Sequence, residues 1–420
     1  MVGGAFGTAF ARSGFSHKVW RQTSVVVIKR DAVLYSLYKK SEESNMRQTL
    51  KFLTLTVTLT IAAMTAAAQT TAKEFYEKGK AESQKGEFKA AGENYRKAYE
   101  LDPKAMPPAL SDVVAKMNAK DVAGGYEALS AAIKADPNDP YFYFIRGIIS
   151  TVPGAPPSAA GTMMADLEKV LAAFPNNAGA YFFRSAMRLD KVDLDGAIAD
   201  ATTALDLRAQ LESRDIAGAY FNRGKARFGK KDYDGANLDL TKAIELDPKN
   251  VDLYLVRAGA RVNKNDMQGV IADYSKVIEL QPSNAQAIIT RGQIRMGTKD
   301  WDGSIADFTK AIQIDPKNAQ IPYYNRAQSR FSKDDYPGAI VDCTKSIEVD
   351  PKYAPAYDLR GLMRGITNDP TGSVTDITKA IQLVPDNPEY YKHRANQYRG
   401  MNKLALAAAD EKRAAALEKK

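Results

Sequence analysis

Cysteine and histidine, which form most disulfide frameworks and transition-metal sites, are scarce in this chain. Its 420 residues include a single cysteine, Cys343, and two histidines, His17 and His393. One cysteine cannot form an intramolecular disulfide or a multi-cysteine zinc or iron–sulfur site, and two histidines cannot supply a histidine-rich metal site. We therefore expect a protein that is not an enzyme and that uses no metal and no cofactor.

Arginine and aspartate recur at a fixed spacing, which is the most regular chemical pattern in the sequence. Seven pairs share one interval, and an eighth, given last, has a slightly longer one: Arg184/Asp200, Arg223/Asp239, Arg257/Asp273, Arg291/Asp307, Arg326/Asp342, Arg360/Asp376, Arg394/Asp410 and Arg146/Asp166. The spacing predicts a ladder of internal ion pairs, and the alternative is a row of arginines that binds anionic ligands. Equal spacings favour internal pairing, because a ligand site would not need its own counter-charge each time. Arg291, for example, has two candidate partners, Asp307 and the preceding Asp273.

The positive charge of the chain is concentrated near its start. The formal net charge is +9, and residues 1–68 contribute +6 of it, because nine lysines and arginines stand there against three acidic residues. The remaining residues carry only +3, with both signs interspersed. Such a balanced surface gives no reason to expect a nucleic-acid partner.

Residues 46–68 have the composition and order of an export signal. A short basic region begins at Met46, an uncharged apolar stretch follows, and an A-x-A cleavage signal ends at Ala68. We expect cleavage after Ala68 and a periplasmic or secreted protein; the alternative is an uncleaved segment through which the chain contacts a membrane. We interpret residues 1–45 as an upstream extension that is unstructured or not translated, because they show no helical or strand period.

Turns that contain proline recur along the sequence at steps of about 34 residues. The phrase L-D-P-K-N and its variants run from Pro103 to Pro385, and two insertions, 151–161 and 209–215, lengthen the steps where they occur. We expect both insertions to be loops. The pattern divides residues 69–420 into ten repeats: 72–103, 106–137, 140–175, 178–209, 217–248, 251–282, 285–316, 320–351, 354–385 and 388–420.

Each repeat has the sequence of two short helices joined by a turn. In residues 219–250, small residues and one large residue recur at helical spacing: Gly224, Ala236, Leu240 and Ala243. Asp232 is placed to cap the second helix and Pro248 to end it. Cys343 takes the position of Leu240 in its own repeat, so we expect a buried thiol rather than a nucleophile.

These repeats resemble the tetratricopeptide repeat family, whose 34-residue unit has an aromatic residue, small residues, a bulky residue and a closing proline at the same spacings. The resemblance is weakest over residues 106–137, where two prolines and two glycines disturb both helices. It implies an all-α fold, a right-handed superhelical solenoid of antiparallel helix pairs whose first helices line a concave groove. It also implies a protein-binding module whose partner is another protein or a peptide.

By analogy with that family, the positions that face the groove form an apolar row with amide side chains among them. The predicted partner-binding residues are Phe144, Ile148, Phe182, Phe221, Asn222, Phe228, Leu255, Ile289, Gln293, Met296, Tyr324, Asn325, Gln328 and Phe331. The clamp that some members of the family use for the carboxylate of a chaperone tail is missing, since its positions hold Phe221, Lys225, Val256, Gln286 and Thr290.

Two functions are consistent with this pattern. The first is an exported scaffold that holds a peptide segment or helix of an envelope or secreted partner in its groove. The second is a structural or accessory subunit of a cell-envelope assembly that acts through its convex face and ends. We favour the first, because an apolar row with amide donors suits a bound peptide.

Overall fold

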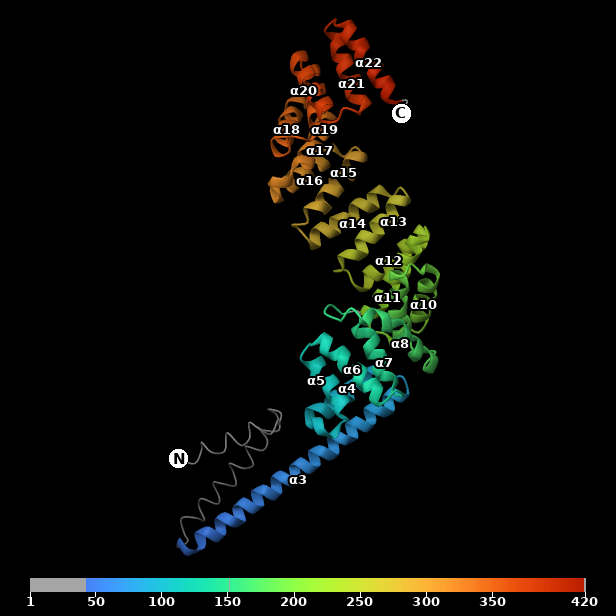
Figure 1. Ribbon diagram of the computed structural model, residues 1–420, viewed down its shortest axis with the longest axis vertical. Helices are drawn as coiled ribbons and strands as arrows, with labels where there is room; N and C mark the ends of the chain where they lie inside the picture. Colours follow the sequence, from blue (N-terminus) through green and yellow to red (C-terminus); the bar gives the residue numbers. More distant parts are fainter. Residues whose placement is uncertain (1–42, 151, 419–420) are drawn as a thin grey trace. The chain divides into compact units, whose positions relative to one another are not determined.

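Helices are the only regular secondary structure in residues 43–150 and 152–418, the residues that this computed structural model describes (Figure 1). Short turns join most of the helices, and within each of the two units described below each helix contacts the next one in the chain. The protein is therefore an all-α stack of helix pairs, and the predicted fold class is confirmed. The chain divides between Glu212 and Ser213 into two compact units, which are considered separately.

The first unit contains eight α-helices and two short 3₁₀ helices in its described part. In chain order they are α3 (Glu43–Gln84), α4 (Phe88–Leu101), η1 (Pro103–Ala105), α5 (Pro108–Asn118), α6 (Val122–Ala135), α7 (Pro140–Ile149), α8 (Ala159–Ala173), α9 (Ala178–Asp190), α10 (Leu194–Asp206) and η2 (Arg208–Gln210).

The second unit contains six helix pairs in which a first helix is followed by a second helix. The pairs are α11 (Ser213–Gly229) with α12 (Tyr233–Leu246), α13 (Val251–Asn263) with α14 (Met267–Leu280), α15 (Ala285–Gly297) with α16 (Trp301–Ile314), α17 (Gln320–Phe331) with α18 (Tyr336–Val349), α19 (Ala354–Ile366) with α20 (Pro370–Leu383), and α21 (Pro388–Gly400) with α22 (Leu404–Glu418). A 3₁₀ turn, η3 (Pro316–Asn318), joins α16 to α17.

Small residues set the close contact within each pair, as the pair α11–α12 shows. A Cβ atom added to Gly224 would lie 3.1 Å from Cγ of Leu240 and 3.4 Å from the carbonyl oxygen of Ala236. Leu240 itself is fully buried between the helices. The Asp232 side chain accepts a hydrogen bond of 2.9 Å from the Gly235 amide and so caps α12 as predicted.

Both predicted loops are partly helical, which corrects the sequence interpretation. In the insertion 151–161, α8 already begins at Ala159, and in the insertion 209–215, α11 begins at Ser213. The prolines are confined to the first part of the earlier insertion, so nothing in its last three residues stops a helix from starting there.

The predicted export signal, residues 46–68, lies within the long helix α3. Most of the predicted upstream extension, residues 1–42, lies outside the described residues. Among the helices that are described, none combines the length and the apolar character that a membrane span requires.

In the first unit, the turn between α3 and α4 packs against the third helix pair. Phe88 stacks on Phe144 of α7 with ring centroids 4.6 Å apart, and it meets Phe174 edge-on at 5.6 Å. A Cβ atom on Gly86, whose φ is +81°, would lie 2.9 Å from the Phe174 ring. The chain's own first repeat therefore covers Phe144.

A residue in the left-handed region of φ closes the turn inside most helix pairs. These residues are Lys120, Val192, Lys231, Asn265, Lys299, Asp334, Asn368 and Asn402, with φ between 56° and 66°. Asparagine and aspartate tolerate this conformation, whereas a branched Cβ opposes it. Val192, at φ 61°, is therefore the most strained of the eight.

Replacing Val192 by asparagine is expected to raise the free energy of unfolding by about 1 kcal/mol, because asparagine adopts the left-handed conformation at lower cost. The Val192 side chain is 73% exposed, so its removal sacrifices no core packing. Urea unfolding followed by circular dichroism measures the change. Asn265→Val should lower stability by a similar amount, and a Val192→Asn protein no more stable than the wild type would refute the idea.

Candidate partner-binding site

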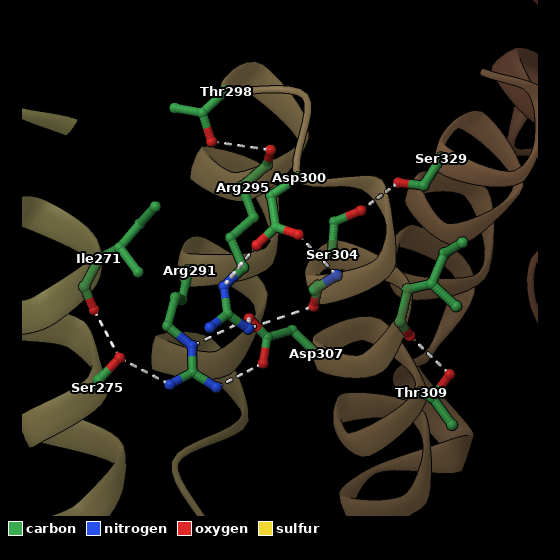
Figure 2. Close-up of polar contacts among 12 residues, drawn as sticks. Ile271, Ser275, Arg291, Arg295, Thr298, Asp300, Ser304, Asp307, Thr309 and Ser329 are labelled. Atoms are coloured by element: carbon green, nitrogen blue, oxygen red, sulfur yellow. Dashed lines mark hydrogen bonds and ion pairs between the residues drawn. The ribbon is translucent and has the colours of Figure 1, made fainter. Parts of the chain in front are cut away.

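The arginine ladder pairs each arginine with the aspartate of its own repeat. In the pair α15–α16, Arg291 donates from Nε to Asp307 Oδ2 at 3.0 Å and from Nη2 to Oδ1 at 2.5 Å (Figure 2). Its remaining nitrogen, Nη1, donates to the hydroxyl of Ser275 in the preceding helix, α14, at 2.9 Å. One guanidinium thus connects three helices and two repeats. The aspartate of the preceding repeat, Asp273, pairs with its own arginine instead.

The same bidentate geometry recurs in all eight predicted pairs, with nitrogen–oxygen distances between 2.5 and 3.2 Å. All eight aspartates are buried. Arginines of the ladder also donate to a hydroxyl of the preceding second helix, among them Arg146 to Ser130, Arg257 to Thr241, Arg291 to Ser275, Arg326 to Thr309, Arg360 to Thr344 and Arg394 to Thr378.

Six of these aspartates also pair with a second arginine, which the spacing pattern above did not include. It stands one helical turn after the first, as Arg295 does after Arg291, and its Nη1 lies 2.9 Å from Asp307 Oδ2 (Figure 2). Its Nε lies 3.4 Å from the helix-capping Asp300. The equivalent residues elsewhere are Arg188, Arg227, Arg261, Arg330 and Arg364. The repeated sequence R-x-x-x-R, always at the same distance before the aspartate, is the signal that identifies them.

These contacts decide between the two interpretations of the arginine row. Each ladder guanidinium has its carboxylate, and six of the eight also lie over the ring of a tyrosine one helical turn earlier, as Arg184 does over Tyr181 at 5.4 Å. Hydrogen bonding to Asp200 raises the pKa of Arg184 above its ordinary value. The arginines are thus structural pairs rather than an anion-binding row.

The predicted partner-binding residues of the first unit are not equally open. Phe144 is stacked on Phe88 and meets Phe183 edge-on at 6.3 Å, so it is engaged inside the chain. Phe144 is half-buried, and its role in binding a partner stays a prediction. Ile148 and Phe182 are half-buried, and the Phe182 ring packs against Phe183 at 4.8 Å.

In the second unit, most of the predicted residues are half-buried and lie against the core. Phe221 and Phe228 pack on the cluster around Leu240, Ile289 packs on the cluster around Ile288, and Tyr324 and Phe331 pack on the cluster around Cys343. Gln328 donates to the Tyr324 hydroxyl at 3.2 Å, and Met296 is half-buried. Leu255, 37% exposed, and Gln293 are open to solvent, whereas Asn222 and Asn325 are buried.

Three further apolar side chains of first helices are exposed, and the sequence analysis did not select them. They are Val262 in α13, 46% exposed, Ile321 in α17, 42% exposed, and Ile366 in α19, 53% exposed. Leu255 and Val262 are two helical turns apart in α13, so they lie on the same side of that helix. We refer to Leu255, Val262, Ile321 and Ile366 as the first-helix face.

We call the first helices of the second unit, α11, α13, α15, α17, α19 and α21, the first-helix layer; their contacts with one another fall in two runs, α11 with α13 and α15 to α21. Besides its own second helix, α11 contacts α13, α15 contacts α17, α17 contacts α19, and α19 contacts α21. Within each run, side chains at equivalent positions of successive first helices are therefore neighbours. This arrangement lets one extended ligand contact several repeats.

Cys343 lies in the core, and His393 is hydrogen-bonded to an acid. Cys343 is fully buried as predicted, and burial raises the pKa of its thiol. His393 Nδ1 lies 2.9 Å from Asp358 Oδ1, and this hydrogen bond raises the pKa of His393. In the described part of the chain, no three histidine, cysteine or acidic side chains come together as a metal site would require.

Comparison with known proteins gives matches to a single kind of repeat. One model of the tetratricopeptide repeat matches residues 217–250, and another model of the same repeat matches residues 72–105. No curated protein sequence matches the chain.

Several solved structures share the helix-pair architecture with part of the chain. PilW, described as a widely conserved type IV pilus biogenesis factor, is 17% identical, covers 48% of this chain and 93% of its own, and gives a TM-score of 0.40. YrrB, described as having an unusual peptide-binding site, is 20% identical over 45% of this chain and 95% of its own, with a TM-score of 0.39. PilF of Pseudomonas aeruginosa is 16% identical over 47% and 90%, with a TM-score of 0.38.

Proposed function

Since this chain is a tetratricopeptide repeat protein, we propose that it is a non-enzymatic scaffold that binds a peptide segment or helix of another protein. The binding surface in this proposal is the layer of first helices in the second unit. The observation that carries the proposal is the first-helix face, four apolar side chains that are 37–53% exposed, two of them on α13 and one each on the contacting helices α17 and α19. Covering such side chains with a partner removes apolar surface from water.

A buried amide beside this face supports a peptide ligand. Asn325 in α17 is 5% exposed, and its Nδ2 has no hydrogen-bond partner within the described residues. A buried donor without an acceptor costs free energy that a partner's backbone carbonyl would recover. The same helix contributes Tyr324 and the exposed Ile321.

The proposed contact residues of the second unit are the predicted ones together with three additions, Val262, Ile321 and Ile366. The predicted ones are Phe221, Asn222, Phe228, Leu255, Ile289, Gln293, Met296, Tyr324, Asn325, Gln328 and Phe331. In the first unit, considered by itself, Phe144, Ile148 and Phe182 stay predictions.

The proposal is tested by capturing partners from the native organism with crosslinking and mass spectrometry. Changing both Leu255 and Ile321 to serine is expected to weaken partner capture at least tenfold, because each loses most of its apolar contact. The matched control changes Leu238 and Val341 to serine; these side chains of second helices are 67% and 57% exposed. Loss of partners in the control alone would instead favour the alternative, an assembly subunit that acts through its convex face.

Export from the cytoplasm, and a partner in the envelope or outside the cell, form a separate part of the proposal. It is supported by the basic, apolar and A-x-A order of residues 46–68. The intact mass of the native protein is expected to correspond to a chain that starts at Gln69. A native chain that retains residues 1–45 would refute both the cleavage and the start at Met46.

A further inference from the structure

One position of the apolar row holds an acid. In successive first helices the equivalent residues are Phe182, Phe221, Leu255, Ile289 and Tyr324, and the next, one repeat later, is Asp358 in α19. Asp358 is 8% exposed. The equivalent residue of the last repeat is Lys392, so the position is apolar in the five repeats before α19 and not in the one after it. A carboxylate removed from most of its water needs a compensating cation.

The cation that the chain provides for Asp358 is a weak one. Within residues 43–150 and 152–418, the hydrogen-bond partner of its carboxylate is the imidazole of His393 in α21, at 2.9 and 3.0 Å. The permanent cations nearby are engaged elsewhere: Arg360 pairs with Asp376 at 2.7 Å, and Lys392 pairs with Glu389 at 2.7 Å and Glu418 at 2.5 Å.

Tyrosine rings gather at the same place. Tyr324 in α17 meets Tyr353 edge-on with ring centroids 5.4 Å apart, and both rings are partly exposed. Burial raises the pKa of Tyr390 in α21, and the charge of Asp358 raises it further. Burial, with smaller contributions from Tyr353 and Asp358, likewise raises the pKa of Tyr324. The three rings come from α17, from the residue before α19 and from α21, and α19, which carries Asp358, contacts both of the other helices.

We propose that Asp358, with Tyr324, Tyr353, Tyr390 and His393, forms a subsite for one cationic side chain, a lysine or an arginine, of the bound peptide. This inference rests on the proposed function and names a residue type of the partner. The carboxylate supplies a charge-assisted hydrogen bond, and ring faces attract a cation that has lost part of its water. The partly exposed Tyr324, Tyr353 and His393 give the cation access from solvent.

A bound cation competes with the protonated His393 for the single carboxylate. Hydrogen bonding to Asp358 raises the pKa of His393, whereas burial lowers it. Two nearby charges act in opposite directions: Glu389 raises this pKa and Lys392 lowers it. When a ligand ammonium pairs with Asp358, protonated His393 loses its stabilising partner, and its pKa should fall. Binding of a cation should therefore release a proton and become tighter as pH rises through the pKa of His393.

The test uses Nα-acetyl-lysine methylamide as the probe and Nα-acetyl-norleucine methylamide as its uncharged match. The imidazole resonance of His393 in the full chain is identified by its absence in His393→Gln. The lysine probe is expected to shift this resonance in a saturable manner and to lower the pKa of His393, and the norleucine probe to do neither. Asp358→Asn should abolish the lysine response, whereas Asp252→Asn, an exposed acid in the first helix α13, should retain it.

Asp358→Asn could impair folding, so a second variant leaves the carboxylate in place. Tyr353→Leu removes one ring face and is expected to weaken lysine binding about threefold to tenfold. Equal responses to the two probes, or a full response in Asp358→Asn, would overturn the subsite. An absent lysine response together with partner capture that depends on Leu255 would overturn the subsite and leave the scaffold standing. A normal lysine response without such capture would uphold the subsite and overturn the scaffold.

Discussion

Replacing Asp307 by asparagine is expected to lower the free energy of unfolding by about 3–5 kcal/mol, because two guanidinium groups lose their carboxylate together. The side chains of Arg291 and Arg295 are 15% and 22% exposed, and that of Asp307 is 4% exposed. Poor hydration of all three makes the loss of the one anion costly. Urea unfolding followed by circular dichroism measures the difference.

Arg291→Met is expected to cost less than Asp307→Asn, because Arg295 still neutralises Asp307 at 2.9 Å. The matched control is Asp302→Asn in the same helix, where the carboxylate is 82% exposed and should matter little. If Asp307→Asn destabilises the protein no more than Asp302→Asn, the ladder is not a source of stability. If Arg291→Met proves the more damaging change, the sharing of one carboxylate by two arginines is wrong.

Removing the last helix, residues 404–420, is expected to unfold α21 as well and to lower the melting temperature by about 5–10 °C. Arg394 would lose Asp410, to which it donates twice at 2.8 Å. Tyr390 and Tyr391 would lose the cover of Ala414 and Leu417. A terminal repeat of a solenoid must shield the last apolar surface from water. Thermal melting and binding of a fluorescent apolar dye report the loss.

The control for this truncation is a chain that ends at Leu417, which keeps the cover of Tyr390 and Tyr391. It keeps Ala407, Asp410 and Ala414, the buried residues of α22, and should melt close to the intact protein. A chain that ends at Lys403 yet melts like this control and binds no more dye would show that α22 does not close the stack.

The sequence was sufficient for the features that repeat. The spacing of prolines predicted helix pairs, Asp232 predicted a helix cap, and the constant interval from arginine to aspartate predicted which side chains form ion pairs. Each of these depends on contacts inside one repeat or between adjacent repeats, so the same signal occurs many times. The choice between Asp307 and Asp273 as the partner of Arg291 needed the packing distance of the helices, which spacing does not provide.

Features that occur once were not predictable in the same way. Phe144 was predicted to face a partner, and no spacing pattern indicated that its ring also contacts Phe88 of the first helix pair. This contact depends on the irregular repeat 106–137 between them, whose path no periodic pattern specifies. Asp358 and His393 are 35 residues apart, and only the contact between α19 and α21 brings them together. The second arginine, by contrast, carried a periodic signal that was overlooked.

The Arg–Asp ion pairs also affect where each unit bends most easily. Within a repeat, the two helices are joined by two charge-assisted bonds from one arginine and a third bond from the next. Between repeats, the same arginine contributes one bond to a serine or threonine hydroxyl, which carries no charge of its own. Bonds to a carboxylate are stronger than bonds to a neutral acceptor, so each unit resists bending less at its repeat junctions than inside its repeats. A bound ligand that bends a unit would therefore change the angle between neighbouring repeats. The angle between the two helices of each pair would stay nearly the same.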